Sequence, residues 1–115
     1  MKTPSDPTAS WQRRYQRLCA SLARTGYISQ GSVLDRSTLQ PPRSGFQWTR
    51  KLARKTITIA LSPQQFEFLR QAIKNRRRLQ KTVDEMEKLT RQILFQILPD
   101  TRRRKPLRKK DFGLI

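Results

Sequence analysis

The sequence predicts an α+β fold with an N-terminal helix, a small antiparallel β-hairpin or three-stranded sheet, and a long C-terminal helix. Two observations predict it. First, apolar residues recur at helical spacing near the start of the chain and again in its second half. Second, in the segment between these two regions apolar and polar residues alternate with the period of a β-strand. The 115 residues suit one domain. We therefore expect a disordered lead-in over residues 1–9, a single small domain over residues 10–99, and a disordered basic tail over residues 100–115.

The first expected element is a helix over residues 10–25. Ser10 is the expected N-cap, and Gly26 is a natural stop just past the helix. Cys19 lies beside the apolar stripe, and we interpret it as a small buried hydrophobic residue. The stripe falls at i, i+4, i+7 and i+11 and consists of Trp11, Tyr15, Leu18 and Leu22.

A β region is expected over residues 28–61. Period-2 alternation places Ile57, Ile59 and Leu61 on one face of a strand. We predict two strands over residues 46–61, joined near Leu52–Lys55, and a third, weaker strand around residues 31–36. Because the chain has few apolar residues, we interpret Phe46 and Trp48 as core anchors of a thin sheet; base stacking by Trp48 is the alternative.

A long helix is expected over residues 63–98. Ser62 as N-cap, Pro63 at the first helical position and Gln65 in a capping box start it, and Pro99 stops it. The apolar stripe breaks near residues 74–78, which leaves open whether the region is one helix or two. Its second half either packs on the first helix or binds a second copy or another protein, through Leu79, Val83, Met86, Ile93 and Ile97.

Charge is the strongest functional signal. The chain has 26 Lys and Arg against 8 Asp and Glu, a net charge of +18. Such self-repulsion favours a polyanionic partner, with nucleic acid first because phosphate neutralisation releases counterions. A membrane surface is less well supported, because acids lie on the polar face of the long helix and Trp and Phe are not concentrated opposite them. We expect a basic accessory or regulatory protein that contacts the phosphate backbone, with DNA slightly favoured over RNA.

Three clusters carry the expected phosphate contacts: the hairpin, the middle of the long helix and the tail. No residue is assigned to base readout. The alternative function is a small protein–protein interaction subunit of a larger nucleoprotein complex, held by the long C-terminal helix. The expected nucleic-acid-binding residues are Arg50, Lys51, Arg54, Lys55, Lys74, Arg76, Arg77, Arg78, Arg102, Arg103, Arg104, Lys105, Arg108, Lys109 and Lys110.

Composition argues against catalysis, a metal site and a cofactor. The chain has one cysteine and no histidine, which removes the commonest general base and metal ligand. The carboxylates are scattered or lie on a helix surface, and no glycine run cradles a phosphate. We therefore expect that the protein is not an enzyme. No apolar run reaches the roughly 18 residues of a membrane span, and the N-terminus lacks a signal peptide. We expect a cytoplasmic protein, associated with the nucleoid if it binds DNA.

Several motifs together resemble a known family. They are Gly31-Ser32-Val33, Gly45-Phe46-Gln47-Trp48-Thr49-Arg50-Lys51, Lys55-Thr56-Ile57-Thr58-Ile59, Leu61-Ser62-Pro63-Gln64-Gln65, Ile73-Lys74-Asn75-Arg76-Arg77-Arg78-Leu79 and Met86-Glu87-Lys88-Leu89. Residues 28–98 resemble an uncharacterised family of small bacterial proteins, a domain of unknown function often encoded among mobile-element genes. The resemblance implies a hairpin followed by a long helix. Typical members carry a cysteine cluster where this chain has Thr38–Gly45, so the metal site that the resemblance implies is missing, and the loop must be held by packing and its prolines or be mobile.

Overall fold

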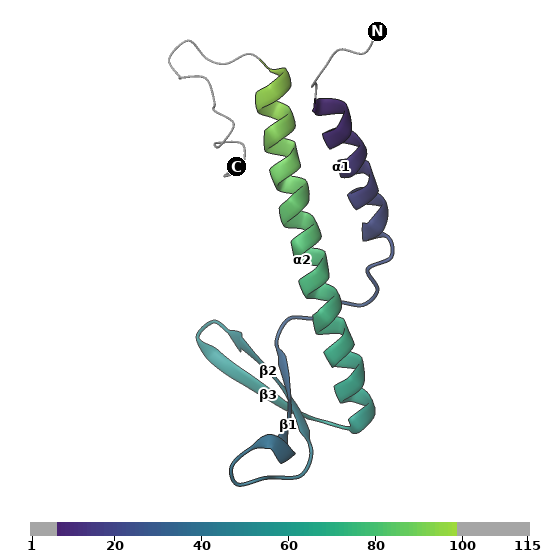
Figure 1. Cartoon of the computed structure of the whole chain (residues 1–115). Helices are drawn as coiled ribbons and strands as arrows, with labels where there is room; N and C mark the ends of the chain where they lie inside the picture. Colours follow the sequence, from purple (N-terminus) through teal and green to yellow (C-terminus); the bar gives the residue numbers. More distant parts are fainter. Residues whose placement is uncertain (1–6, 99–115) are drawn as a thin grey trace. The chain divides into compact units, whose positions relative to one another are not determined.

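The computed structural model describes residues 7–98 and confirms the α+β fold (Figure 1). The chain divides into two compact units. We call Thr25–Gln80 the sheet unit, and residues 7–24 with 81–98 the helical unit. The elements, in order, are α1 (Thr8–Leu22), β1 (Ser32–Asp35), a 3₁₀ turn η1 (Arg36–Thr38), β2 (Phe46–Leu52), β3 (Lys55–Leu61) and α2 (Pro63–Ile97).

The sheet is antiparallel throughout, in the order β1-β2-β3. Trp48 of the central strand pairs with Val33 on one side and Ile59 on the other, so these three side chains share a face. Phe46 pairs with Leu61 on that same face, and its ring contacts the ring of Phe66 on α2, with centroids 4.5 Å apart. This apolar face therefore packs toward α2, while threonines such as Thr58 lie on the opposite, open face.

A two-residue turn joins β2 to β3, within the connection predicted near Leu52–Lys55. Ala53 and Arg54 have φ angles of 50° and 69°. Positive φ at both central positions is the geometry of the tight hairpin turn that matches strand twist, although Asn-Gly is the sequence that adopts it most easily. The turn thus presents Arg54 at the tip of the hairpin at the cost of a left-handed backbone.

Helix α2 is one continuous helix, which settles the question that the sequence left open. It begins with the expected capping box: the Ser62 hydroxyl accepts the backbone N–H of Gln65 at 3.1 Å, and the Gln65 side chain accepts the N–H of Ser62 at 2.9 Å. The basic run at residues 74–78 lies within unbroken helix. The stripe is interrupted there by charge, not by a turn.

The core of the sheet unit is small. Ala72 and Ile73 on α2 are buried, and the indole N–H of Trp48 donates to the carbonyl of Gln30 at 2.9 Å. Gly31 has a φ of +102°, and a Cβ there would lie 2.5 Å from the indole nitrogen of Trp48. Trp48 is thus half-buried and tied to the segment before β1, in agreement with its interpretation as an anchor.

In the helical unit, α1 runs antiparallel beside the second half of α2 (Figure 1). Leu89 is its buried apolar residue, and Arg14 pairs with Glu85 across the two helices. Helix α1 begins earlier than predicted, so Ser10 is not its N-cap. Pro7 holds that position, because its φ of −74° is already helical and its carbonyl accepts the N–H of Trp11 at 2.9 Å.

Two further expectations for α1 are wrong. The helix ends at Leu22, before Gly26, where the Ser21 hydroxyl bonds the Leu18 carbonyl at 2.6 Å and the N–H of Arg24 bonds Ser21 in a tighter turn. Cys19 is exposed, because it lies off the stripe that packs on α2. No helix among residues 7–98 is both long and apolar enough to cross a membrane.

Candidate nucleic-acid interface

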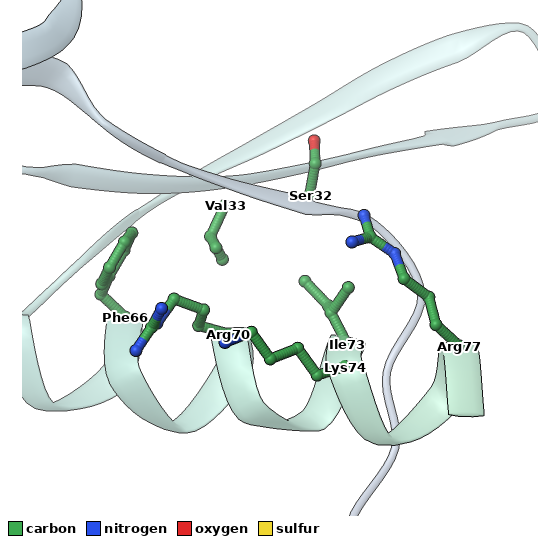
Figure 2. A pocket seen from close by; sticks show the side chains of 7 residues that line it. All are labelled: Ser32, Val33, Phe66, Arg70, Ile73, Lys74 and Arg77. Atoms are coloured by element: carbon green, nitrogen blue, oxygen red, sulfur yellow. The ribbon is translucent and has the colours of Figure 1, made fainter. Parts of the chain in front are cut away.

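A cleft of about 240 Å³ lies between β1 and the first half of α2, within the sheet unit. We call it the basic cleft. Figure 2 shows Val33 pointing from β1 toward the helix and Ile73 pointing back toward β1, with cationic side chains projecting from α2 around them. The lining residues are Ser32, Val33, Phe66, Arg70, Ile73, Lys74 and Arg77.

Helical periodicity brings the three cations of the cleft together. Arg70, Lys74 and Arg77 fall at i, i+4 and i+7, so they lie on one side of α2. Ile73 is only 6% exposed and fixes that side of the helix against the strand. The three cationic residues are exposed, and they share the lining of the cleft with the apolar side chains of Val33, Phe66 and Ile73. The result is an apolar floor with cationic walls.

The sheet unit has very little negative charge to neutralise these cations. It contains eleven Lys and Arg residues against two acids, Asp35 and Glu67. Glu67 pairs with Arg70 at 3.1 Å on the exposed helix surface, where such a pair is weak. Asp35 accepts the hydroxyl and the backbone N–H of Ser37, and these hydrogen bonds lower the pKa of its carboxyl. Neither carboxylate lines the cleft.

The structure divides the predicted helical cluster. Lys74 and Arg77 line the cleft. Arg78 instead donates to the side-chain oxygen of Asn75 at 3.0 Å and to the carbonyl of Thr25 at 3.4 Å, which ties the segment before β1 to α2. Arg76 is half-buried and does not line the cleft. A phosphate ligand in the cleft would therefore meet two of the four predicted cations.

Arg70 is the cleft residue that sequence reasoning missed. It lies four residues before Lys74 and seven before Arg77, so the signal was its helical spacing and not the contiguous run of charge. The phosphate contacts were predicted from the contiguous run Arg76-Arg77-Arg78, but consecutive residues point to different sides of a helix. Strand β1 crosses this side of α2. Residue spacing alone does not predict this tertiary contact, because it joins segments that are far apart in the sequence.

The hairpin cations lie outside the cleft. Arg50 and Lys51 point to opposite faces of β2, and Arg54 and Lys55 lie at the turn. Lys51, Arg54 and Lys55 are exposed. Arg50 is half-buried, and its Nε is buried without a hydrogen-bond partner among the described residues. The hairpin therefore forms a second cationic surface at its tip. The seven tail cations, Arg102, Arg103, Arg104, Lys105, Arg108, Lys109 and Lys110, lie outside the described residues.

The predicted partner-binding stripe is largely half-buried in the structure. Leu79, Val83, Met86 and Ile93 are half-buried, and Ile97 is 55% exposed. Leu89, which the stripe omitted, is the most buried residue of this half of α2 at 4%. Helix α1 therefore packs on a line beside the predicted stripe. Within this half of α2, the exposed large apolar side chains lie toward its end, at Leu94 and Ile97.

A second hollow, of about 250 Å³, lies within the helical unit, and we call it the interhelical groove. Its walls carry Arg14 and Lys88, but also Glu85, which pairs with Arg14. An anion entering this groove would meet a carboxylate and a cation that already has a partner. The lining residues are Trp11, Arg14, Glu85, Lys88, Leu89 and Gln92.

Residues 7–98 contain no group of three or more His, Cys, Asp or Glu side chains placed to hold a metal ion. The loop before β2 is held by backbone hydrogen bonds of Arg36, whose N–H donates to Gly45 at 2.9 Å and whose carbonyl accepts Arg43 at 3.0 Å. No family model, curated protein or solved structure matches the chain. The resemblance to a family of small bacterial proteins, often encoded among mobile-element genes, stays a prediction.

Proposed function

We propose that this protein binds nucleic acid through its phosphate backbone, and that the basic cleft of the sheet unit is the principal contact. The observation that carries the proposal is the convergence of Arg70, Lys74 and Arg77 on a hollow that no carboxylate lines. Like charges at i, i+4 and i+7 repel one another, and a bound phosphate would relieve that repulsion. The cleft therefore favours an anion at the place where the cations gather.

The walls and the floor of the cleft suit a phosphodiester chain. Guanidinium groups can grip phosphate oxygens with two hydrogen bonds, and the lysine ammonium adds a point charge. The apolar floor of Val33, Phe66 and Ile73 offers no polar group that would read a base edge. The proposed binding is thus to the backbone. The preference for DNA over RNA and the role as an accessory or regulatory factor stay predictions from the sequence.

The exposed hairpin cations extend the proposed surface. Lys51, Arg54 and Lys55 lie at or near the tip of β2 and β3. A basic two-stranded ribbon can follow a phosphate backbone or enter a groove of duplex DNA. The tail cations would add contacts that are weak individually and sensitive to salt.

The test removes the three positive charges of the cleft in one variant and three positive charges of the helical unit in a control, and compares the nucleic-acid affinities of the two. Arg70, Lys74 and Arg77 are replaced by Gln in one full-length variant, and Arg13, Arg17 and Lys81 of the helical unit are replaced by Gln in the control. All six side chains are exposed, so both variants should keep their helix content by circular dichroism. Fluorescence anisotropy with labelled duplex DNA, single-stranded DNA and structured RNA is measured across a salt series, with and without residues 101–115.

The cleft variant should lose about a hundredfold in affinity for duplex DNA at ~0.1 M salt, and its slope of log Kd against log salt should shrink by close to three. The control should lose less than about tenfold, through the long-range field alone. Equal losses in the two variants would contradict a role of the cleft. Binding that vanishes on removal of residues 101–115 would reduce the proposal to the tail.

The second candidate function is docking to a protein partner within a nucleoprotein complex. It is favoured by exposed apolar side chains at the end of α2: Leu94 is 39% exposed, and Ile97 and Leu98 are each 55% exposed. Replacing Ile97 and Leu98 by Ser should leave nucleic-acid affinity unchanged if these residues serve a protein partner. A matched loss of affinity would instead place them in the nucleic-acid interface.

A further inference from the structure

Strand β3 forms an open edge of the sheet. It pairs with β2 on one side, and within residues 7–98 no backbone hydrogen bond reaches its other side. Edge strands are usually protected by short length, charge, proline or a covering element. Strand β1 at the opposite edge is short, with four residues, and continues into the loop that Arg36 holds. Strand β3 has seven residues, and from Thr56 to Leu61 it carries neither charge nor proline.

The sequence of β3 is complementary to itself when it is reversed about Thr58. In an antiparallel pair of two copies centred there, Thr58 lies opposite Thr58, and Ile57 lies opposite Ile59. Thr56 faces Ala60 and Lys55 faces Leu61, so no two like charges oppose each other. All seven residues of the strand are used. A register centred on Ile57 or Ile59 would pair fewer of them.

We propose that a second copy of this chain pairs with β3 in that register, so that two three-stranded sheets join into one sheet of six strands. Two observations favour a second copy over another partner: the self-complementary pattern, and the exposure of apolar side chains on the same edge. Ile59 is 50% exposed and Ile57 is half-buried. The new pairing would place Ile57 of one copy against Ile59 of the second copy, and Ile59 of the first against Ile57 of the second. Both side chains would then be removed from water.

Charge opposes this association, and its salt dependence identifies it. Each copy carries a net charge of +18, so two copies repel each other at low salt. Salt screens that repulsion and does not weaken the apolar and backbone pairing. The dimer should therefore become more populated as salt rises. Nucleic-acid binding has the opposite dependence, so the two proposals can fail independently.

Cysteine cross-linking tests the register. Thr58→Cys and, as its control, Thr56→Cys are each made in a full-length Cys19→Ser background and equilibrated in a thiol–disulfide buffer. Thr58 and Thr56 are both exposed on the open face of β3. In the proposed dimer the two Cα atoms at position 58 lie about 5 Å apart, within the span of a disulfide. The two at position 56 lie roughly 13 Å apart, which is beyond it.

Thr58→Cys should give at least about tenfold more disulfide-linked dimer than Thr56→Cys. Sedimentation of the unmodified chain without nucleic acid should show the dimer fraction rising from ~0.1 M to ~1 M salt. Equal cross-linking of the two variants would overturn the register. A chain that stays monomeric at high salt, or that loses its dimer as salt rises, would overturn the self-association.

Discussion

The basic cleft of the sheet unit and the interhelical groove of the helical unit have similar volumes, about 240 and 250 Å³, but opposite electrostatic designs. The cleft gathers three cations and no acid among its lining residues. The groove includes Glu85, which already pairs with Arg14. The comparison teaches that net charge does not decide where a polyanion binds. For the proposed binding, what matters is whether a carboxylate lines the same hollow as the cations: Glu67, which pairs with Arg70, does not line the cleft, whereas Glu85 lines the groove.

Acids are also distributed unequally between the two units. Asp84, Glu85 and Glu87 all lie in the part of α2 that belongs to the helical unit. The half of α2 that belongs to the sheet unit carries one acid, Glu67. One continuous helix thus presents a cationic segment and a mixed segment. The first segment suits phosphate, and the second suits ion pairs between helices.

The largest expected effect comes from Gly31→Ala, which should disrupt the sheet unit, and with it the basic cleft, without changing any charge. The added Cβ would lie 2.5 Å from the Trp48 indole nitrogen and 2.7 Å from the Thr49 carbonyl oxygen, at a φ of +102°. We expect a loss of about 3 kcal/mol or more in the free energy of unfolding. Urea denaturation followed by tryptophan fluorescence measures it. Because the sheet unit is destabilised, nucleic-acid affinity should also fall. An unchanged free energy of unfolding would contradict this prediction and show that β1 can shift to make room for the added Cβ.

The next effect concerns the other unit. Leu89→Ala removes the buried apolar residue of the helical unit, and should cost about 3 kcal/mol in local stability. Hydrogen exchange should show faster opening of α1 and of the second half of α2, while residues 25–80 keep their protection. Affinity for duplex DNA should be unchanged. A fall in affinity equal to that of the cleft variant would contradict the assignment of binding to the sheet unit.

A smaller effect is expected from Glu85→Gln, which gives the interhelical groove the charge pattern of the cleft. Arg14 and Glu85 are 56% and 34% exposed, so loss of their pair should cost only about 0.5 kcal/mol. Affinity for DNA should rise by about twofold, because a carboxylate has gone and Arg14 is released. Anisotropy against the parent protein measures the change. A decrease in affinity would mean that the pair holds a surface on which binding depends.

The smallest effect is the pH response of Asp35, one of the two acids of the sheet unit. Hydrogen bonds from the Ser37 hydroxyl and N–H lower the pKa of this carboxyl from its usual value of 3.8. Its stabilisation is therefore complete above that value and is lost as pH falls through the lowered pKa. Ser37→Ala removes the hydroxyl donor, so the pKa of Asp35 should rise. A carbon-detected NMR titration measures it, and an unchanged titration would contradict the role of Ser37.

Local signals in the sequence were sufficient for much of the fold. The Ser62–Gln65 capping box and the alternation over residues 46–61 both gave elements close to those observed, because each depends on neighbours in sequence. The start of α1 was misplaced, since Ser10 is a strong capping residue by type, but Pro7 already has helical φ and ψ angles. Caps compete locally, and sequence alone did not rank these two.

The candidate site was predicted less completely, because it depends on which strand crosses which side of a helix. Lys74 and Arg77 were identified from charge, but Arg70 became visible only when β1 marked the relevant side of α2. Leu89 was missed for the same reason: two apolar stripes overlap on α2, and only the position of α1 shows which is buried. Long-range packing is the information that periodicity lacks.

The most direct test of the central claim is an NMR titration of the full-length protein with a short DNA duplex at ~0.15 M salt, following backbone amides and arginine side-chain N–H groups. The account predicts the largest shifts at Ser32, Val33 and residues 70–77, with little change at Glu85, Lys88 and Gln92 of the interhelical groove. Shifts concentrated in the groove, with the cleft unaffected, would contradict the claim that the sheet unit carries the binding.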